Sequence, residues 1–255
     1  MLFADVQLAR RVEAAEAAIA RACRDENSEV LEIAGGCAIF AGVDSPLTQA
    51  VGLGLNGPVT PSEVGRLEAF FHSYGSHPRL DLCPLADPAF LESITSRYHI
   101  AEFNNVLVRP VQGLEITLTP RVRRAMPGER DVWSHAVGYG FFEQPELTTP
   151  EMDVGRAIFD MPGALCYLTG TESADSAGGG AMAIFEGLAV LFSDSTIPMW
   201  RRLGLHRELI SARLNEAVAR CCTLAAASTL PGSASQRNYE RLGFQVAYTK
   251  FVAVG

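Results

Sequence analysis

The sequence predicts an α+β protein made of two units of similar plan. Its 255 residues are 48% hydrophobic and 20% charged, which is typical of globular chains, and the length suits two domains. Helix-like and strand-like periodicities alternate along both halves. The halves also end alike, because the alternation in Arg97–Arg109 recurs in Arg241–Ala253. We therefore expect one domain at residues 1–110 and a second at residues 111–255.

In the first domain, apolar residues recur at the helical period through residues 4–24, which predicts a helix there. Glu29–Ala41 is rich in strand-forming residues, and a pair of glycines interrupts it. That pattern predicts either two strands with a tight turn or one bulged strand. Thr60 and Glu63 have the spacing of a capping box around Pro61, so we expect a helix to begin there.

In the second domain, Leu205–Cys222 is the clearest helix, because one of its faces is apolar at the helical spacing. Leu114–Leu118 alternates as a strand does. Ala181–Phe185 and Leu188–Ser193 are predicted to pair as strands across a short turn, and Ser173–Gly180 is predicted to be a flexible turn.

The charge balance and the segment types exclude several classes of protein. A net charge of −8 and an isoelectric point near 5.2 argue against a general nucleic-acid binder, which usually has a basic face. No stretch reaches the ~18 apolar residues of a membrane span, and the N-terminus lacks the charged start of a signal peptide. The six cysteines form no C-x-x-C pair, so we expect mostly buried, reduced thiols, no metal site and a cytoplasmic protein.

A basic loop that contains a glycine precedes the clearest helix. Arg201, Arg202 and Arg207 surround the point where the helix begins, and Gly204 lets an anion approach the backbone closely. The first amides of a helix lack partners within it and carry the positive end of its dipole. These features predict a site for an anion such as a pyrophosphate, and the alternative is a cationic helix start without function.

A second segment, Asn238–Phe244, is predicted to be a short helix closed by Gly243 and followed by a strand. Together with the basic loop before it, this segment resembles the GNAT superfamily of acyltransferases. Residues 201–206 are similar to the family's R/Q-x-x-G-x-G/A loop, and Tyr239–Phe244 matches its Y-E-R-L-G-F ending at every position. The resemblance covers about residues 114–255, and it implies units that are each a mixed, mostly antiparallel sheet flanked by helices.

The resemblance implies where acetyl-CoA, the cosubstrate, would bind. The edge of the strand Leu188–Asp194 would pair with the pantetheine arm, and the basic loop would hold the pyrophosphate. His206 departs from the family pattern, which has glycine or alanine there, and its side chain would narrow the loop or donate to a phosphate. The implied cofactor-binding residues are Leu191, Phe192, Ser193, Arg201, Arg202, Leu203, Gly204, Leu205, His206, Arg207, Ser235 and Asn238.

The resemblance also implies that Tyr239 protonates the leaving thiolate of CoA, with packing at a helix–strand corner as the alternative. A phenol suits this role because its reference pKa of about 10 keeps it protonated at neutral pH. The base for the attacking amine is less clearly marked. Among the side chains Glu186, at the start of the central strand, is the first choice, with Asp194 and His135 as alternatives, and deprotonation through water is the other route.

The sequence therefore predicts an N-acetyltransferase that moves an acetyl group from acetyl-CoA to an amine by direct attack in a ternary complex. The first domain has neither motif, so it is predicted to be a degenerate unit that completes the acceptor cleft or covers an edge of the second. A CoA-binding sensor or scaffold with little catalysis is the alternative. The acceptor is an unknown small molecule or peptide, and a homodimer is one option for the assembly.

Overall fold

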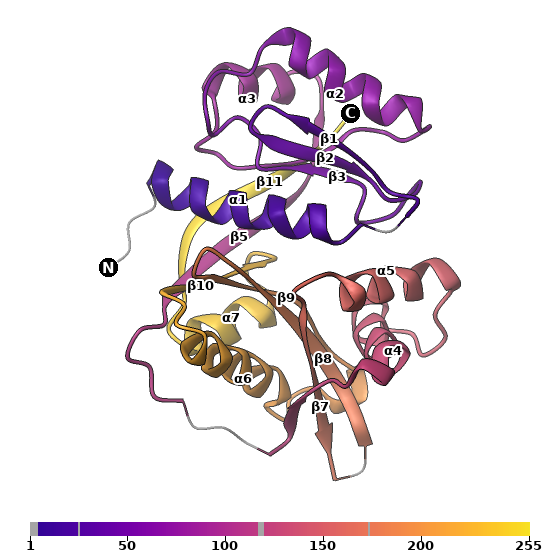
Figure 1. The fold of residues 1–255 in the computed structure, drawn as a ribbon, viewed down its shortest axis with the longest axis vertical. Coiled ribbons are helices and arrows are strands. Elements are labelled where there is room, and N and C mark those ends of the chain that lie inside the picture. The colour runs from indigo at the N-terminus through magenta and orange to yellow at the C-terminus, as the bar shows by residue number, and fades with distance from the viewer. Residues whose placement is uncertain (1–4, 25, 117–119, 173) are drawn as a thin grey trace. The chain divides into compact units, whose positions relative to one another are not determined.

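The structure is a computed structural model that describes residues 5–24, 26–116, 120–172 and 174–255. The chain divides into two compact units (Figure 1). The first unit extends to Leu107 and also contains Thr229–Pro231 and Val246–Gly255, and the second contains the remaining residues. The break after Leu107 lies close to the predicted boundary at residue 110, but the C-terminal strand groups with the first unit and not with the second. The division into sequential domains at residue 110 stays a prediction.

The sheet of the first unit has the strand order β1-β2-β3-β4-β11-β5. Strands β3 and β4 are parallel, whereas the pairs β1–β2, β2–β3 and β4–β11 are antiparallel. Figure 1 shows the yellow strand β11 within this unit, where it pairs with β4. The elements are α1 (Val6–Ala22), β1 (Glu29–Ile33), β2 (Gly36–Phe40), β3 (Gln49–Val51), α2 (Pro61–Ser73), β4 (Arg79–Leu82), α3 (Pro88–Thr95), β5 (His99–Pro110) and β11 (Gln245–Val254).

Helices cover both faces of this sheet. The clusters around β2 show this, because alternate residues of a strand face opposite sides. Cys37 and Ile39 of β2 pack in one apolar cluster with Ala17 of α1. Ala38, between them, belongs to a second cluster with Phe71 of α2. The predicted hairpin of β1 and β2 is confirmed. The predicted capping box at Thr60 is also confirmed, and α2 begins directly after it.

The second unit has the strand order β10-β9-β8-β7-β6, with β9 and β10 parallel and the other pairs antiparallel. Both units are therefore mixed, mostly antiparallel sheets flanked by helices, as predicted. The elements are β6 (Val122–Arg124), α4 (Arg130–Phe142), α5 (Thr149–Asp160), β7 (Leu165–Thr171), β8 (Ala174–Phe185), β9 (Leu188–Thr196), α6 (Leu205–Ala219), β10 (Leu224–Thr229) and α7 (Ala234–Arg241).

The glycines that were predicted to form a flexible turn lie instead within β8. The prediction for Ser173–Gly180 is therefore wrong from Ala174 onward, and Ser173 lies outside the described residues. A Cβ atom on Gly179 would lie 3.0 Å from Trp133 Nε1 of α4, and one on Gly180 would lie 2.9 Å from Arg213 Nη1 of α6. Since neighbouring residues face opposite sides, α4 and α6 cover opposite faces of the sheet, and the glycines let both approach it closely.

The strand predicted at Leu114–Leu118 falls partly outside the described residues. Residues 114–116 form no strand, and the sheet edge in this part of the unit is β6, a few residues later. None of the helices in the described parts of the chain has both the length and the apolar character that a membrane crossing requires.

Candidate active site

The parallel strands β9 and β10 of the second unit stop pairing before they end. Their ladder runs from Leu188–Leu224 to Leu191–Ala227, whereas β9 continues to Thr196. Backbone donors and acceptors of β9 beyond Leu191 therefore lie past the last residue pair that it shares with β10. This opening follows directly on the core of the sheet, where Leu191 is 2% exposed.

A bulge in β9 begins at the same point. The residue pairs on its two sides are Phe192–Ala181 and Ser195–Gly179. Ser193 and Asp194 therefore oppose the single residue Gly180 of β8, and Ser193 has a left-handed φ of 55°. The bulge turns the Asp194 side chain toward α6. A Cβ on Gly180 would lie 2.6 Å from Asp194 Oδ1, so only glycine leaves room for this carboxylate.

The buried carboxylate of Asp194 is the centre of a polar cluster in the second unit. Its Oδ1 forms an ion pair with Arg213, which is fully buried, and its Oδ2 accepts a hydrogen bond from the Tyr239 hydroxyl. His206 Nε2 lies 3.3 Å from the same Oδ2. The other ring nitrogen of His206, Nδ1, lies 3.0 Å from the Asn238 amide nitrogen. The cluster therefore joins β9, the start of α6 and α7.

The electrostatics of this cluster keep the carboxylate charged and the phenol neutral. Burial by itself raises the pKa of Asp194, but the Arg213 charge, the nearby His206 ring and the hydrogen bond from Tyr239 hold that pKa below its usual value. Burial and the neighbouring Asp194 charge raise the pKa of Tyr239 well above its usual value. Arg213 also donates from Nε to the Leu209 carbonyl at 3.0 Å and from Nη1 to the Ala181 carbonyl at 2.9 Å.

The basic loop leads from β9 into α6 by an exposed turn. Arg202 and Gly204 have left-handed φ values of 67° and 84°, and α6 begins at the buried Leu205. The left-handed conformation suits a glycine but strains an arginine. The strain at Arg202 indicates that the surrounding structure holds the loop backbone in one conformation. The exposed residues 201–204 lead into the first amides of α6, which no side chain of the N-cap Gly204 caps and where the sequence predicted an anion site.

Arg201 is bound to the protein itself. Its guanidinium pairs with Glu143 at 2.6 Å and donates to the Gly140 carbonyl at 2.8 Å and to the Thr196 carbonyl at 3.1 Å. It therefore fixes the loop to the end of α4. Arg202 and Arg207 are exposed, and their positions on either side of Gly204 make them the arginines best placed to meet an anion.

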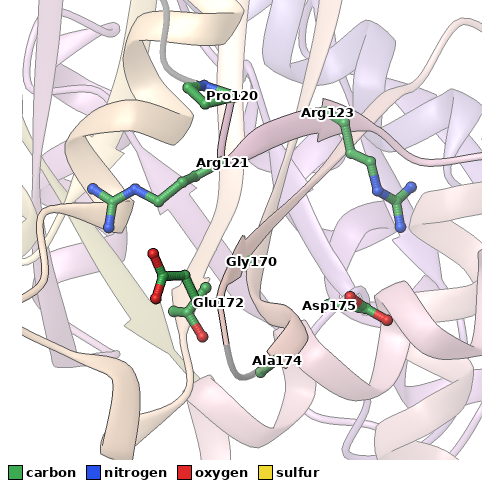
Figure 2. Close-up of a pocket in the computed structure, with 8 residues that line it drawn as sticks. Pro120, Arg121, Arg123, Gly170, Glu172, Ala174 and Asp175 are labelled. Carbon is green, nitrogen blue, oxygen red and sulfur yellow. The ribbon is translucent and has the colours of Figure 1, made fainter.

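A second ion pair lies against the same helix start and was not anticipated from the sequence. Arg121 donates from Nε to Glu208 at 3.0 Å and from Nη2 to the Leu203 carbonyl at 3.2 Å. It thus neutralises the one acidic residue in the first turn of α6. Arg121 also lines a pocket of about 310 Å³, in which Figure 2 shows Glu172 on the side of Arg121 and Asp175 on the side of Arg123.

Several of the predicted site residues come together. Tyr239 and His206 meet at Asp194, and Asn238 contacts His206. The ring of His206 turns inward, away from the loop that it was expected to narrow. Ser235 lies half-buried in the first turn of α7. The predicted cofactor-binding residues Leu191, Phe192 and Ser193 lie at the opening and the bulge of β9, and Arg201, Arg202, Leu203, Gly204, Leu205 and Arg207 form the loop and the start of α6.

The predicted base is not part of this group. Glu186 lies in the β8–β9 turn with a φ of 45°, and Asp194 lies near the other end of β9. At about 3.3 Å per residue, roughly 20 Å of strand separates them. His135, one of the alternatives, has Nε2 2.8 Å from the Pro145 carbonyl in the α4–α5 connection. The structure therefore brings neither side chain to Tyr239.

Arg213 is the residue of the cluster that the sequence reasoning missed. It follows Leu209 by one helical turn, on the apolar face of α6. A charged side chain at an apolar helical position is the available signal, because a buried charge requires a partner. The partner, Asp194, lies on a different element, so the helix alone does not identify it.

Solved structures that resemble this chain share one fold. A GCN5-related N-acetyltransferase from Kribbella flavida matches 96% of this chain and 95% of its own length, with a TM-score of 0.70 and 17% identity. A tandem GNAT protein from the clavulanic acid biosynthesis pathway, solved without AcCoA, matches 99% and 96%, with a TM-score of 0.61 and 13% identity. No protein-family model and no curated protein matches the sequence.

A further GCN5-related N-acetyltransferase, from Sphaerobacter thermophilus, matches 89% of this chain and 75% of its own, with a TM-score of 0.55 and 13% identity. At these identities the likeness concerns the fold alone. The tandem protein and the Kribbella protein match almost the whole chain, including the half in which the sequence contains neither motif. The fold of this chain is therefore that of the GNAT acetyltransferases, present as two tandem GNAT-like units.

Proposed function

We propose that the second unit transfers an acetyl group, or a related short acyl group, from acetyl-CoA to an amine by direct attack in a ternary complex. The observation that carries this proposal is the opening between β9 and β10 beside the exposed start of α6. An extended amide-containing arm can pair with the stretch of β9 beyond its ladder with β10, while an anion at its end meets the amides of the helix.

Acetyl-CoA has an extended arm with amides, the pantetheine, and an anion, the pyrophosphate. The backbone of residues 191–193 would pair with the pantetheine amides, and Arg202 and Arg207 would meet the pyrophosphate with the loop amides. Ser235 and Asn238 on α7 are the remaining proposed contacts. Arg201 would act indirectly, because its guanidinium holds the loop against Glu143 and the end of α4.

Tyr239 is the proposed proton donor to the leaving thiolate. Its raised pKa keeps the phenol protonated at neutral pH, which a donor requires. A base for the amine is assigned to water, since Glu186 and His135 lie elsewhere and Asp194 accepts from Tyr239. Direct attack then forms the bond from the amine nitrogen to the acyl carbon, breaks the carbon–sulfur bond and returns one proton to sulfur.

We assign no CoA site to the first unit, and the start of α2 supports this. That helix follows the parallel strand β3, as α6 follows β9. Its first amides are satisfied differently, because Pro61 has no N–H and the Thr60 hydroxyl accepts from the Glu63 amide. The Glu63 carboxylate also places a negative charge at this helix start, which repels a second anion.

Isothermal titration with acetyl-CoA, with free CoA beside it, tests the binding step. We expect one site per chain. The variant Arg202→Ala with Arg207→Ala should weaken binding by about 1–3 kcal/mol, because it removes charge-assisted contacts to the pyrophosphate. Arg66→Ala, an exposed arginine on α2, is the matched control and should leave the affinity unchanged. No heat of binding to the native protein would refute the acyltransferase proposal.

A CoA-binding sensor is the second candidate, and one observation favours it. The Tyr239 hydroxyl is buried and donates to Asp194, so in this structure its proton points to a carboxylate and not to an open cleft. A sensor would bind acetyl-CoA in the titration but release no CoA with a broad panel of primary amines. Release of CoA that depends on one of the amines would exclude this candidate.

A further inference from the structure

We propose that Asp194 is a positioning residue of the acyl-transfer site, which fixes the Tyr239 hydroxyl and the His206 ring through one shared carboxylate oxygen. The proposal rests on the proposed function, because it concerns how the acid of that reaction is held. Both groups lie at Oδ2, while Oδ1 is occupied by Arg213.

The cluster has the features of a built site. Arg213 is fully buried and has a second set of bonds to the Leu209 and Ala181 carbonyls, so its guanidinium is fixed independently of the carboxylate. The bulge at Ser193 and the absence of a side chain at Gly180 make room for Asp194. Burying an ion pair costs free energy of desolvation unless further hydrogen bonds satisfy both groups. Here the two carbonyls bind the Arg213 guanidinium, and the Tyr239 hydroxyl binds the Asp194 carboxylate.

Hydrogen bonding fixes the tautomer of His206. The amide oxygen of Asn238 accepts from Arg241 Nη1 at 3.3 Å, so the amide nitrogen is the atom that faces His206 Nδ1, at 3.0 Å. Nδ1 must then be the acceptor, and the proton of a neutral ring is on Nε2, which faces Asp194 Oδ2 at 3.3 Å. A carboxylate can only accept, so both contacts of the ring agree with one tautomer.

This arrangement couples the two functional segments of the second unit. His206 is the second residue of α6, directly after the loop proposed to hold the pyrophosphate, and Tyr239 lies on α7. Their rings meet edge to face with centroids 5.9 Å apart. Through Asp194, the helix start and the phenol have one fixed relation, so the position of the Tyr239 ring is already set when CoA occupies the loop.

The test uses Asp194→Asn in the full chain, with CoA release from acetyl-CoA and the best amine of the panel as the activity. We expect kcat to fall at least ~10-fold while KM for acetyl-CoA changes less than ~3-fold, since misorientation of the acid affects the chemical step. The second variant, Asp194→Asn with Arg213→Met, removes the unpaired charge. We expect it to recover most of the melting temperature but not kcat.

Asp81→Asn is the matched control, because it removes a half-buried, lysine-paired carboxylate of the first unit. It should lower the melting temperature and leave kcat unchanged. If the double variant recovers kcat together with stability, or if Asp194→Asn has the native kcat, the positioning role is refuted.

A readout without CoA separates this proposal from the proposed function. The ¹⁵N shifts of the His206 ring, assigned with His206→Gln, should show the Nε2–H tautomer in the native protein and a mixture of tautomers in Asp194→Asn. Native shifts in the variant would refute the positioning of the ring. Failure of acetyl-CoA to bind the native protein would refute the function, whatever the ring shifts show.

Discussion

Replacing Lys250 with methionine should strongly destabilise the protein. Lys250 on β11 is 1% exposed, and its ammonium lies 2.8 Å from Asp81 and 3.2 Å from Glu13, and also pairs with Glu16. Glu13 is itself 1% exposed. Methionine keeps most of the length of the lysine side chain but leaves three carboxylates without their cation, and like charges then face one another inside the first unit.

The magnitude follows from what the cluster loses. Removing one partner of a buried ion pair costs about 3–5 kcal/mol, because the remaining charge stays desolvated. Protonation limits the loss, since burial already raises the pKa of Glu13 to about 7 despite the Lys250 charge, and Glu13 will bind a proton when the cation is gone. The hydrogen bond from the Tyr248 hydroxyl, at 2.8 Å, remains to one oxygen of Glu13. We therefore expect a loss of about 3–5 kcal/mol at pH 8.

Urea denaturation followed by far-UV circular dichroism at pH 8 measures this loss. Glu13→Gln in the same chain should reduce the effect of Lys250→Met, because one of the stranded charges is already absent. Arg156→Met is the control for an exposed ion pair and should give no resolvable change. A loss below about 1 kcal/mol for Lys250→Met would mean that the cluster is hydrated and that the reasoning from burial is wrong.

Three further predictions concern the second unit. Gly180→Ala should destabilise it by about 1–3 kcal/mol in urea denaturation, because the new Cβ would lie 2.6 Å from Asp194 Oδ1, whereas Gly128→Ala, with nothing within 4 Å, should be neutral. Tyr239→Phe should lower turnover ~10²-fold with acetyl-CoA affinity kept, and unchanged turnover would remove it as the acid. Glu186→Gln should leave kcat unaltered at every pH, since about 20 Å of strand separates it from Asp194, and a tenfold loss would restore it as the base.

Signals that act within one element were sufficient for much of the fold. The capping box at Thr60 and the apolar face of α6 both depend on residues a few positions apart, and both were predicted. The glycines at residues 178–180 were misassigned because the reason for them lies in two other elements, α4 and α6, which pack against the two faces of β8. A strand likewise does not reveal which sheet it joins, so the pairing of β11 with β4 was not foreseen.

The residues of the candidate site likewise fall into those that local motifs predict and those that depend on distant elements. The loop at Gly204 and the segment ending in Gly243 were identified from local motifs. The pairing of Asp194 with Arg213 depends on a bulge, a distant helix and the missing side chain of Gly180, and none of these is a local property. Glu186 was chosen because it is next to the central strand in sequence, but the hairpin carries it to the far end.

The two buried clusters should respond oppositely to pH. The raised pKa of Glu13, about 7 against 4.5 in the unfolded chain, gives a stabilisation that is present below 4.5 and lost as the pH rises through 7. The lowered pKa of Asp194 gives a stabilisation that is present above 3.8 and lost only as the pH falls below it. Between pH 5 and 8 the first unit should therefore lose stability, by up to about 3 kcal/mol from Glu13, while the Asp194 cluster stays constant.

The chain offers a probe that separates these two responses. Both of its tryptophans, Trp133 and Trp200, lie in the second unit, so their fluorescence reports that unit, whereas circular dichroism reports both. With rising pH, the urea midpoint from circular dichroism should fall ahead of the fluorescence midpoint. Glu13→Gln should abolish most of the difference, because it removes the group that titrates. Midpoints that move together in the native protein would show that the units unfold as one, and that the first cluster limits the stability of both.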